Sequence, residues 1–280
     1  TTDWQPGHSE LLTLGSTPTG KTLTLNSGTP TAHAHQGTIF SIKKSDLSQD
    51  PGHQNMEADV RAAVGLLTRD ITIRSMGAKF DSTSNTPEAF PEASSCTWTE
   101  TQAAADKVIP SCYFGGHVVA RQGFGNFQVQ GVEFYQLGQG GRMGHYPVHF
   151  HMAKDTSYTN AFVRDSSIWD SMTRFVVLHG THGVELSRNV GYLSVGHAFY
   201  LEDASEIDNR LCYNLGVSAQ APYEGYFKAH EKNPGPTARV VPAILSGFAG
   251  ADDQTPALFW MMNTYNEFVG NMAVGAHGMG

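Results

Sequence analysis

The sequence has 280 residues, with 30 glycines, 13 histidines and 3 cysteines, and its 18 basic and 26 acidic side chains give a formal charge of −8. Charged residues make up 16% of the chain, against about a quarter in an average domain, which favours a loop-rich β protein over a helical bundle. At 40% hydrophobic the chain can bury a large core, and this excludes general disorder. The negative charge excludes general nucleic-acid binding, because the phosphate backbone requires a basic surface.

The chain offers few signals for its location. Its longest apolar runs, residues 175–178 and 257–262, are far shorter than the roughly 18 residues of a membrane helix, so we expect no spanning segment. Neither end carries a starting or terminating signal, and we expect the chain to be part of a longer polypeptide or assembly. Cys96 and Cys112 flank a polar segment and could form a disulfide in an oxidising compartment, whereas Cys212 lies in an apolar run and is expected to be a buried thiol.

Short strands separated by Gly, Pro and Asn are predicted in the first part of the chain, at residues 11–14, 21–25 and 38–42. We assign residues 1–58 to an N-terminal β region. Residues 62–67 and 70–74 are interpreted as a strand pair that opens a second unit, residues 59–280. Within it, residues 80–111 are rich in Ser, Thr, Pro and Glu and are interpreted as an excursion from the fold.

An internal repeat dominates the second unit. The run Phe175-Val-Val-Leu-His179 matches Ala198-Phe-Tyr-Leu-Glu202, and a similar strand, Tyr146-Pro-Val-His149, precedes both. The pairs that recur between these strands are Ser167-Ile168, Asn189-Val190 and Asn214-Leu215. A strand-turn-strand unit of about 22–25 residues that stacks on itself predicts a right-handed parallel β-helix, with the recurrent asparagines in a ladder at one corner. A β-sandwich with evenly spaced strands is the alternative.

Several motifs also resemble those of one known family. They are Gly141-Arg142, Tyr146-Pro-Val-His-Phe-His151, Val163-Arg-Asp-Ser-Ser-Ile168, Leu178-His-Gly-Thr-His-Gly183, Asn189-Val-Gly-Tyr192 and Leu201-Glu-Asp203. In this combination the chain resembles the family of the cell-migration-inducing hyaluronan-binding protein, its transmembrane cell-surface hyaluronidase relative and the fibrocystin-like proteins. Residues 61–74 are similar to the family's entry strand, and residues 2–7 to the tail of a preceding glycine-rich domain. The chain departs from the pattern at Met143-Gly144-His145, where the family runs from Gly-Arg directly into the strand.

The resemblance implies an all-β protein at the cell surface or outside the cell. Its fold would be a right-handed parallel β-helix with a short N-terminal β region. Some members of the family are associated with degrading or binding hyaluronan, and others are large receptors with no known chemistry. The resemblance therefore implies a fold and a location, and it leaves the activity open between these two kinds of member.

A histidine-rich ridge is expected on the outside of the helix, because successive strand side chains point to opposite faces. The residues taken to point into the core at matching positions of three coils are Val148, Leu178 and Leu201. On this alignment His149, His179 and Glu202 point outward on consecutive coils about 4.8 Å apart. His151 shares this face, two residues after His149.

Three imidazoles on one patch are typical of transition-metal ligation. We predict that His149, His151 and His179 bind a divalent metal, with Zn²⁺ or another first-row ion favoured over Ca²⁺ because the ligands are mainly nitrogen. Ligation requires neutral imidazole. A patch of surface histidines without a metal is the alternative.

The same ridge offers groups for acid–base chemistry on a sugar. The candidate catalytic residues are His179, His182, Glu202 and Asp203. The candidate substrate-binding residues are Arg142 and Arg164, which could hold a carboxylate, and Tyr200 and Trp260, which could stack on sugar rings. Arg164 could instead form a structural ion pair with Asp165, and the aromatic rings could cap the coil.

Two functions remain open from the sequence. The first is an extracellular carbohydrate-active protein, a hyaluronidase-like hydrolase that cleaves a glycosaminoglycan-like or other polysaccharide in a metal-bearing groove. The second is a non-catalytic structural or adhesive β-helix module of a larger cell-surface protein. The expected partner is a glycan, although the charge of −8 weakens the case for hyaluronan, because a polyanion meets a repulsive field.

Overall fold

The computed structural model describes residues 8–26, 31–42, 55–59, 61–75, 80–81, 86–87, 115–139, 143–220, 255–276 and 278. The strands are β1 (Phe40–Ile42), β2 (Met56–Ala58), β3 (Ile71–Arg74), β4 (Phe80–Asp81), β5 (Thr86–Pro87), β6 (Val118–Arg121), β7 (Phe127–Gln130), β8 (Val132–Tyr135), β9 (Val148–Asp155), β10 (Ala161–Arg164), β11 (Ser167–Trp169), β12 (Val176–His182), β13 (Glu185–Ser187), β14 (Val190–Val195), β15 (Phe199–Leu201), β16 (Arg210–Cys212), β17 (Leu215–Gln220), β18 (Phe259–Trp260), β19 (Glu267–Val269) and β20 (Met272–Ala276). These residues contain no α-helix. None of them belongs to a helix long and apolar enough to span a membrane.

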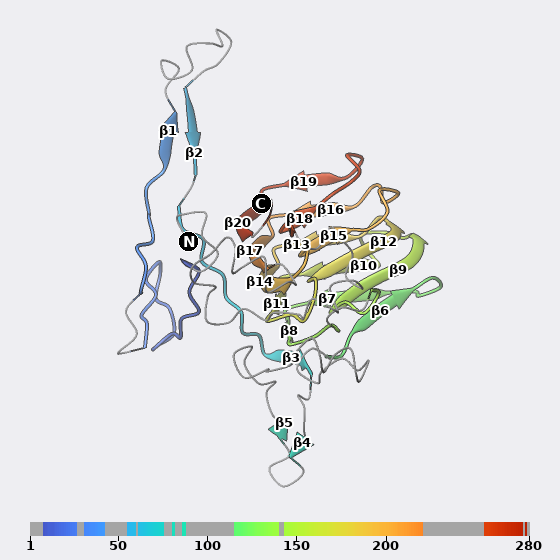
Figure 1. The fold of residues 1–280 in the computed structure, drawn as a ribbon, viewed down its shortest axis with the longest axis horizontal. Coiled ribbons are helices and arrows are strands. Elements are labelled where there is room, and N and C mark those ends of the chain that lie inside the picture. Colours follow the sequence, from blue (N-terminus) through green and yellow to red (C-terminus); the bar gives the residue numbers. More distant parts are fainter. Residues whose placement is uncertain are drawn as a thin grey trace, which may run out of the picture.

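From β6 onward the chain winds through three sheets in a fixed order (Figure 1). The first sheet has the order β18-β15-β12-β9-β6, the second β19-β16-β13-β10-β7 and the third β20-β17-β14-β11-β8-β3. Every pairing within these three sheets is parallel. Each coil therefore stacks on the one before it, and the expected parallel β-helix is confirmed.

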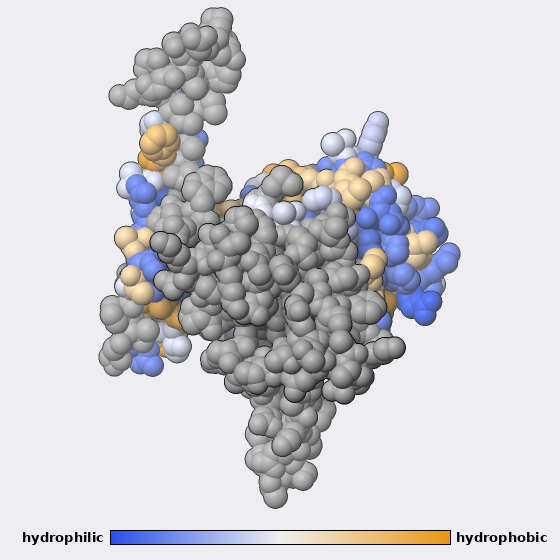
Figure 2. Space-filling view, viewed as in Figure 1, coloured by the Kyte–Doolittle hydropathy of each residue, from blue (hydrophilic) through white to orange (hydrophobic). Residues whose placement is uncertain are grey.

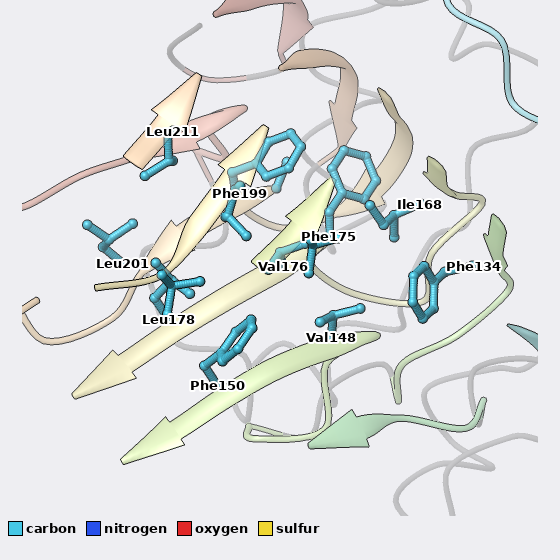
Figure 3. Packing of buried hydrophobic residues seen from close by; sticks show 14 of the residues in the cluster. Phe134, Val148, Phe150, Ile168, Phe175, Val176, Leu178, Phe199, Leu201 and Leu211 are labelled. Atoms are coloured by element: carbon cyan, nitrogen blue, oxygen red, sulfur yellow. The ribbon is translucent and has the colours of Figure 1, made fainter. Parts of the chain in front are cut away.

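The core lies inside the coils and is filled by aliphatic and aromatic side chains. Figure 3 shows side chains of β9, β12 and β15 pointing to the same interior. They include Val148, Phe150, Val176, Leu178, Phe199 and Leu201, all of which are fully buried. A single coil could not bury this surface alone, so the stacking of coils and the formation of the core occur together.

The predicted asparagine ladder is confirmed at the entry to β14, β17 and β20. The amide oxygen of Asn214 accepts the backbone N–H of Asn189 at 3.0 Å, and that of Asn271 accepts the N–H of Asn214 at 2.9 Å. The earlier coil was aligned wrongly by one residue, because Ser167 pairs with Val190, which places Ser166 opposite Asn189. The oxygen of Asn189 accepts the Ser166 N–H.

A second asparagine ladder, which was not predicted, precedes β13, β16 and β19. The amide oxygen of Asn209 accepts the Val184 N–H at 2.9 Å, and that of Asn266 accepts the Asn209 N–H at 3.0 Å. The two members are separated by the long segment between β17 and β18, and this hides the repeat in the sequence.

Residues 61–69 form an extended segment rather than the predicted first strand of a pair; only β3 is a strand. This segment is held by side chains instead of a strand ladder. The hydroxyl of Ser167 donates to the carbonyl of Leu67, and Arg69 donates from Nε to the carbonyl of Asp165 at 2.8 Å. The prediction was wrong because the apolar residues of 62–67 match a strand in composition, while the hydrogen bonds of this segment go to scattered partners: the Ala62 N–H donates to the carbonyl of Gln36, and the carbonyl of Leu67 accepts from Ser167 on β11.

The N-terminal part contains local antiparallel pairs. Isolated bridges join Leu14 to Leu25 and Thr19 to Thr22, and β1 pairs with β2 in a hairpin that stands apart from the helix strands in Figure 1. Within residues 80–111 the structure describes only β4 and β5, which pair antiparallel. Cys96 and Cys112 lie outside the described residues, so their disulfide stays a prediction. Cys212 is a free, half-buried thiol.

The visible surface of the described residues differs from one part of the β-helix to another (Figure 2). Hydrophilic side chains gather where β9 turns into β10. Apolar surface lies along β19, whose Phe268 and Val269 are each 41% exposed.

Candidate metal centre

The histidines lie on the outer face of the first sheet, in two rows that cross its strands. In the first row Val119, His149, Val177, Tyr200 and Trp260 are strand partners. In the second row Arg121 pairs with His151, and His151 pairs with His179. The predicted outward orientation is thus right, but the predicted register is wrong by two residues on β9. Phe150, and not Val148, is the partner of Leu178.

His149 is buried, with 1% of its surface exposed, although it was predicted to be exposed. Tyr146 packs edge-on against its ring, with 4.9 Å between the ring centroids. The Nδ1–H of His149 donates to the carbonyl of Gly144 at 3.0 Å, whereas Nε2 is buried without a hydrogen-bond partner in the structure. Burial lowers the pKa of His149 to about 3, so its ring is neutral at any physiological pH.

His151 and His179 complete the cluster, and both are half-buried. Their Nδ1 atoms lie 3.2 Å apart, and one ring nitrogen from each of the three histidines lies within 4.8 Å of the others. A tetrahedral Zn²⁺ with bonds of about 2.0–2.1 Å needs nitrogens about 3.4 Å apart, so a small inward movement of the wider pairs would complete the geometry. The cluster can therefore hold a metal ion.

Hydrogen bonds orient two of the three rings in the way that metal sites require. Asp203 accepts the Nε2–H of His179 at 2.8 Å, and this leaves Nδ1 of His179 with its lone pair toward His151. For His149, Gly144 accepts the proton on Nδ1 and leaves the lone pair on Nε2. Ligand histidines in metalloproteins almost always donate their other N–H to a carboxylate or carbonyl, which fixes the tautomer.

Glu202 lies beside this cluster. Its Oε2 is 3.8 Å from Nδ1 of His179 and is buried without a hydrogen-bond partner, while Oε1 accepts the Tyr146 hydroxyl at 3.4 Å. Burial raises the pKa of Glu202, although His179 in its protonated form and Arg174 act in the opposite direction. Asp203 contacts the other nitrogen of the same His179 ring, and 49% of its side chain is exposed. Adjacent carboxylates thus occupy two different environments.

The other predicted site residues are placed less favourably. His182 ends β12, and its Nδ1 accepts the N–H of Ile207 at 3.1 Å, so it anchors a loop rather than joining the three-histidine cluster. Arg164 lies on β10 in another sheet and forms a two-point ion pair with Glu185 at 2.7–2.8 Å, not with Asp165. Arg142 lies outside the described residues.

The two aromatic candidates share the outer face with the histidines. Tyr200 and Trp260 are strand partners on β15 and β18. Tyr200 is only 8% exposed, and the guanidinium carbon of Arg174 lies 3.7 Å from the centre of its ring. Trp260 is half-buried and stacks on Tyr200 with 6.4 Å between the rings. Most of the Tyr200 ring is therefore occupied by the protein itself.

Four residues near the cluster were not among the predicted site residues: Arg121, Gly144, Tyr146 and Arg174. Arg121 could have been found by aligning the strand Val118–Arg121 with β9, because inward and outward side chains alternate in the same way along both strands. Gly144 belongs to the three residues that depart from the family pattern. No sequence signal links it to His149, since the contact depends on the path of a loop.

The fold and the cluster together define a parallel β-helix module with a histidine site on one outer sheet. Residues 113–280, more than half of the chain, match the family described as the CEMIP beta-helix. The chain belongs to this family, as the sequence motifs implied.

Curated relatives support the assignment. Communication mutant protein F of Dictyostelium discoideum is 34% identical over 59% of this chain and 14% of that protein. The human cell surface hyaluronidase CEMIP2 is 28% identical over 79% of this chain and 15% of its own length. Human fibrocystin-L is 29% identical over 96% of this chain and 6% of its own length. The chain thus spans a small part of each of these relatives.

Proposed function

We propose that this chain is a metal-dependent, carbohydrate-active β-helix module that acts on a polysaccharide at the cell surface or outside the cell. The observation that supports it most is the buried Nε2 of His149, a neutral nitrogen without a partner that lies beside two further imidazoles. A surface patch of histidines would not need such a nitrogen, because an unsatisfied buried polar atom costs free energy.

The ligands in this proposal are His149, His151 and His179, and the ion is Zn²⁺ or another first-row divalent metal. Three nitrogen ligands favour such an ion over Ca²⁺, which prefers oxygen. When bound, the metal would supply Lewis-acid polarisation and a lowered pKa for a coordinated water. Three protein ligands leave one tetrahedral position for that purpose.

The carboxylates take separate roles. Burial raises the pKa of Glu202 and so favours its protonated carboxyl group, and we assign it the role of a general acid that transfers a proton to a glycosidic oxygen. The Tyr146 hydroxyl orients this group through Oε1. Asp203 accepts the Nε2–H of His179 and keeps its other nitrogen directed at the cluster. His182 acts through the loop that it anchors.

A glycan is the proposed substrate class. The human relative CEMIP2 is named a cell surface hyaluronidase, and this name supports both a polysaccharide and this location for the chain. Arg121, exposed and next to His151, could meet an anionic group despite the overall charge of −8. Trp260 is the proposed aromatic contact, with Tyr200 behind it, and Arg142 remains a candidate for a substrate carboxylate.

A second candidate function is a non-catalytic module. The matched region makes up only 6% of human fibrocystin-L and 15% of human CEMIP2, so in these relatives the β-helix is one part of a much larger protein. In that case the histidine cluster would bind a metal for structural purposes or none at all.

The first experiment measures metal content after dialysis with added Zn²⁺ and removal of the free ion. Wild type should retain about one Zn²⁺ per chain, and His151→Asn or His179→Asn should retain almost none. The matched control is His117→Asn, the same change at an exposed histidine outside the cluster. His149 is a poor choice for this test because its burial would mix loss of folding with loss of metal. Negligible metal in wild type and variants alike would refute the metal site.

The second experiment measures the chain length of polysaccharides after incubation with the protein. A panel of neutral and anionic glycans should include one that wild type shortens and that Glu202→Gln leaves intact. If no glycan is shortened while metal is bound, the non-catalytic module is the better description.

A further inference from the structure

A third acidic residue, Glu206, lies in the loop between β15 and β16 and has no role in the chemistry above. Its exposed fraction is 0%. A buried carboxylate is costly unless it is hydrogen-bonded, so the groups around it show what it holds in place.

The two segments that carry the site residues both donate backbone hydrogen bonds to this carboxylate. Oε1 of Glu206 accepts the backbone N–H of Gly180 at 2.7 Å. The backbone N–H of Asp203 approaches both oxygens, at 3.3 Å to Oε1 and 3.2 Å to Oε2. Gly180 directly follows His179, and Asp203 directly follows Glu202. One buried side chain therefore joins the two segments that hold the site on neighbouring coils.

The strand needs such a support at Gly180. The pairing of β12 with β9 shifts between His179 and Thr181, so the regular ladder is interrupted there. Gly180 has a φ of 51°, and its N–H points to Glu206. β-Bulges redirect side chains, and the hydrogen bond from Gly180 to the Glu206 carboxylate holds this bulge in place.

The loop that contains Glu206 is itself anchored. The carbonyl of Glu206 accepts Nδ2 of Asn266 at 2.8 Å, from the second asparagine ladder. The N–H of the next residue, Ile207, donates to Nδ1 of His182. The backbone beside the carboxylate is thus held by Asn266 of the following coil and by His182 at the end of β12.

We propose that Glu206 is a positioning residue that sets the His179–Asp203 hydrogen bond and thereby presents Nδ1 of His179 to the cluster. The contacts run from Glu206 to the Asp203 N–H, and from the Asp203 carboxylate to Nε2–H of His179 at 2.8 Å. This inference rests on the proposed metal site for its affinity readout, but its effect on the His179 ring is independent of any metal. A residue that only stabilised the loop would not alter that ring.

The chain provides a matched control in Glu133, a second buried carboxylate. It is 7% exposed, lies on β8 in the third sheet, and accepts the Trp169 Nε1–H at 2.8 Å and the Arg69 N–H at 3.3 Å. Replacing either glutamate by glutamine removes a buried charge with hardly any change of volume. The two variants therefore differ mainly in whether they lie beside the histidine cluster.

The test compares wild type, Glu206→Gln and Glu133→Gln by two measurements. Titration with Co²⁺ alone should give a Kd about 10–100-fold weaker for Glu206→Gln, with altered cobalt absorption bands, and a wild-type Kd for Glu133→Gln. The ¹⁵N NMR shifts of the metal-free protein should show His179 with its proton on Nε2 in wild type, and mixed tautomers in Glu206→Gln only. The His179 signal is identified by its loss in His179→Asn.

The outcomes separate the two proposals. If Glu206→Gln and Glu133→Gln lose similar stability but share wild-type Co²⁺ affinity and the wild-type tautomer, Glu206 only stabilises the loop and the inference is overturned. If wild type binds no Co²⁺, the metal site fails, and the tautomer alone decides the role of Glu206. Should Glu206→Gln not fold, Glu206→Asp, which keeps the charge but is too short to reach both N–H groups, must weaken Co²⁺ binding; unchanged binding would equally overturn the inference.

Discussion

Replacing Asn214 by alanine should destabilise the protein more than almost any other change of a polar residue. Asn214 is 1% exposed and lies in the middle of the first asparagine ladder. Its oxygen accepts from the backbone of Asn189, and its Nδ2 donates to the carbonyl of Leu186 and to Asn271, both at 2.9 Å. Alanine leaves the Asn189 N–H and the Leu186 carbonyl buried and without this partner. At about 1–3 kcal/mol for each unsatisfied group, the free energy of unfolding should fall by about 3–4 kcal/mol.

Equilibrium urea unfolding measures this loss as a lower midpoint at an unchanged slope. The matched control is Asn160→Ala in the exposed turn between β9 and β10, which should change the free energy by less than about 0.5 kcal/mol. Asn214→Asp separates hydrogen bonding from packing, because it keeps the volume but turns an acceptor toward Leu186 and Asn271. It should be at least as harmful as alanine at neutral pH. A loss below about 1 kcal/mol for either variant of Asn214 would refute the account of the ladder.

Three further predictions follow from the contacts. Asp203→Asn should weaken Zn²⁺ binding about 10-fold or more in a competition titration, because an amide orients the His179 ring less strongly than a carboxylate; unchanged affinity would contradict this. Gly180→Ala should cost about 1–2 kcal/mol in urea unfolding, because φ is 51° and the new methyl would meet Met152 Sδ at 2.8 Å; a neutral effect would argue against the bulge. Hydrogen bonds from Arg188 lower the pKa of Asp165 below its usual 3.8, so the stability that they provide is present above pH ~4 and is lost as the pH falls through the lowered value. Arg188→Gln should therefore lose less free energy of unfolding than wild type between pH 6 and pH 3. An equal loss in both proteins would contradict this prediction.

The fold could be predicted because its signals are local and repeated. The match between residues 175–179 and 198–202 is reproduced in the pairing of Val176 with Phe199 and Leu178 with Leu201. Alternation also assigned the correct face to His149, His151 and His179. Whether a residue takes an odd or an even position along a strand is a strong signal, because a slip of one residue would place all the hydrophobic side chains on the wrong side of the sheet.

The same two-residue alternation explains the error in register. A slip of two residues keeps every side chain on its face, so the sequence could not distinguish Val148 from Phe150 as the partner of Leu178. The correct register strengthens the site, because it makes His151 the partner of His179 and leaves His149 beside Val177. The burial of His149 could not be predicted either, because it depends on Tyr146 and on the loop at Gly144.

The decisive feature of the site is the direction of its imidazole protons. His149 donates a hydrogen bond from Nδ1–H to the carbonyl of Gly144, and His179 donates one from Nε2–H to the carboxylate of Asp203. The two rings use opposite nitrogens for these bonds, yet each leaves toward the cluster an atom that can only accept. Facing lone pairs repel one another, so such an arrangement is unfavourable unless a proton or a cation lies between them. His151 can supply one proton to His179, 3.2 Å away, but it cannot at the same time satisfy the buried Nε2 of His149. A metal ion would satisfy all three nitrogens at once, and this is the physical argument for the proposed metal centre over a patch of surface histidines.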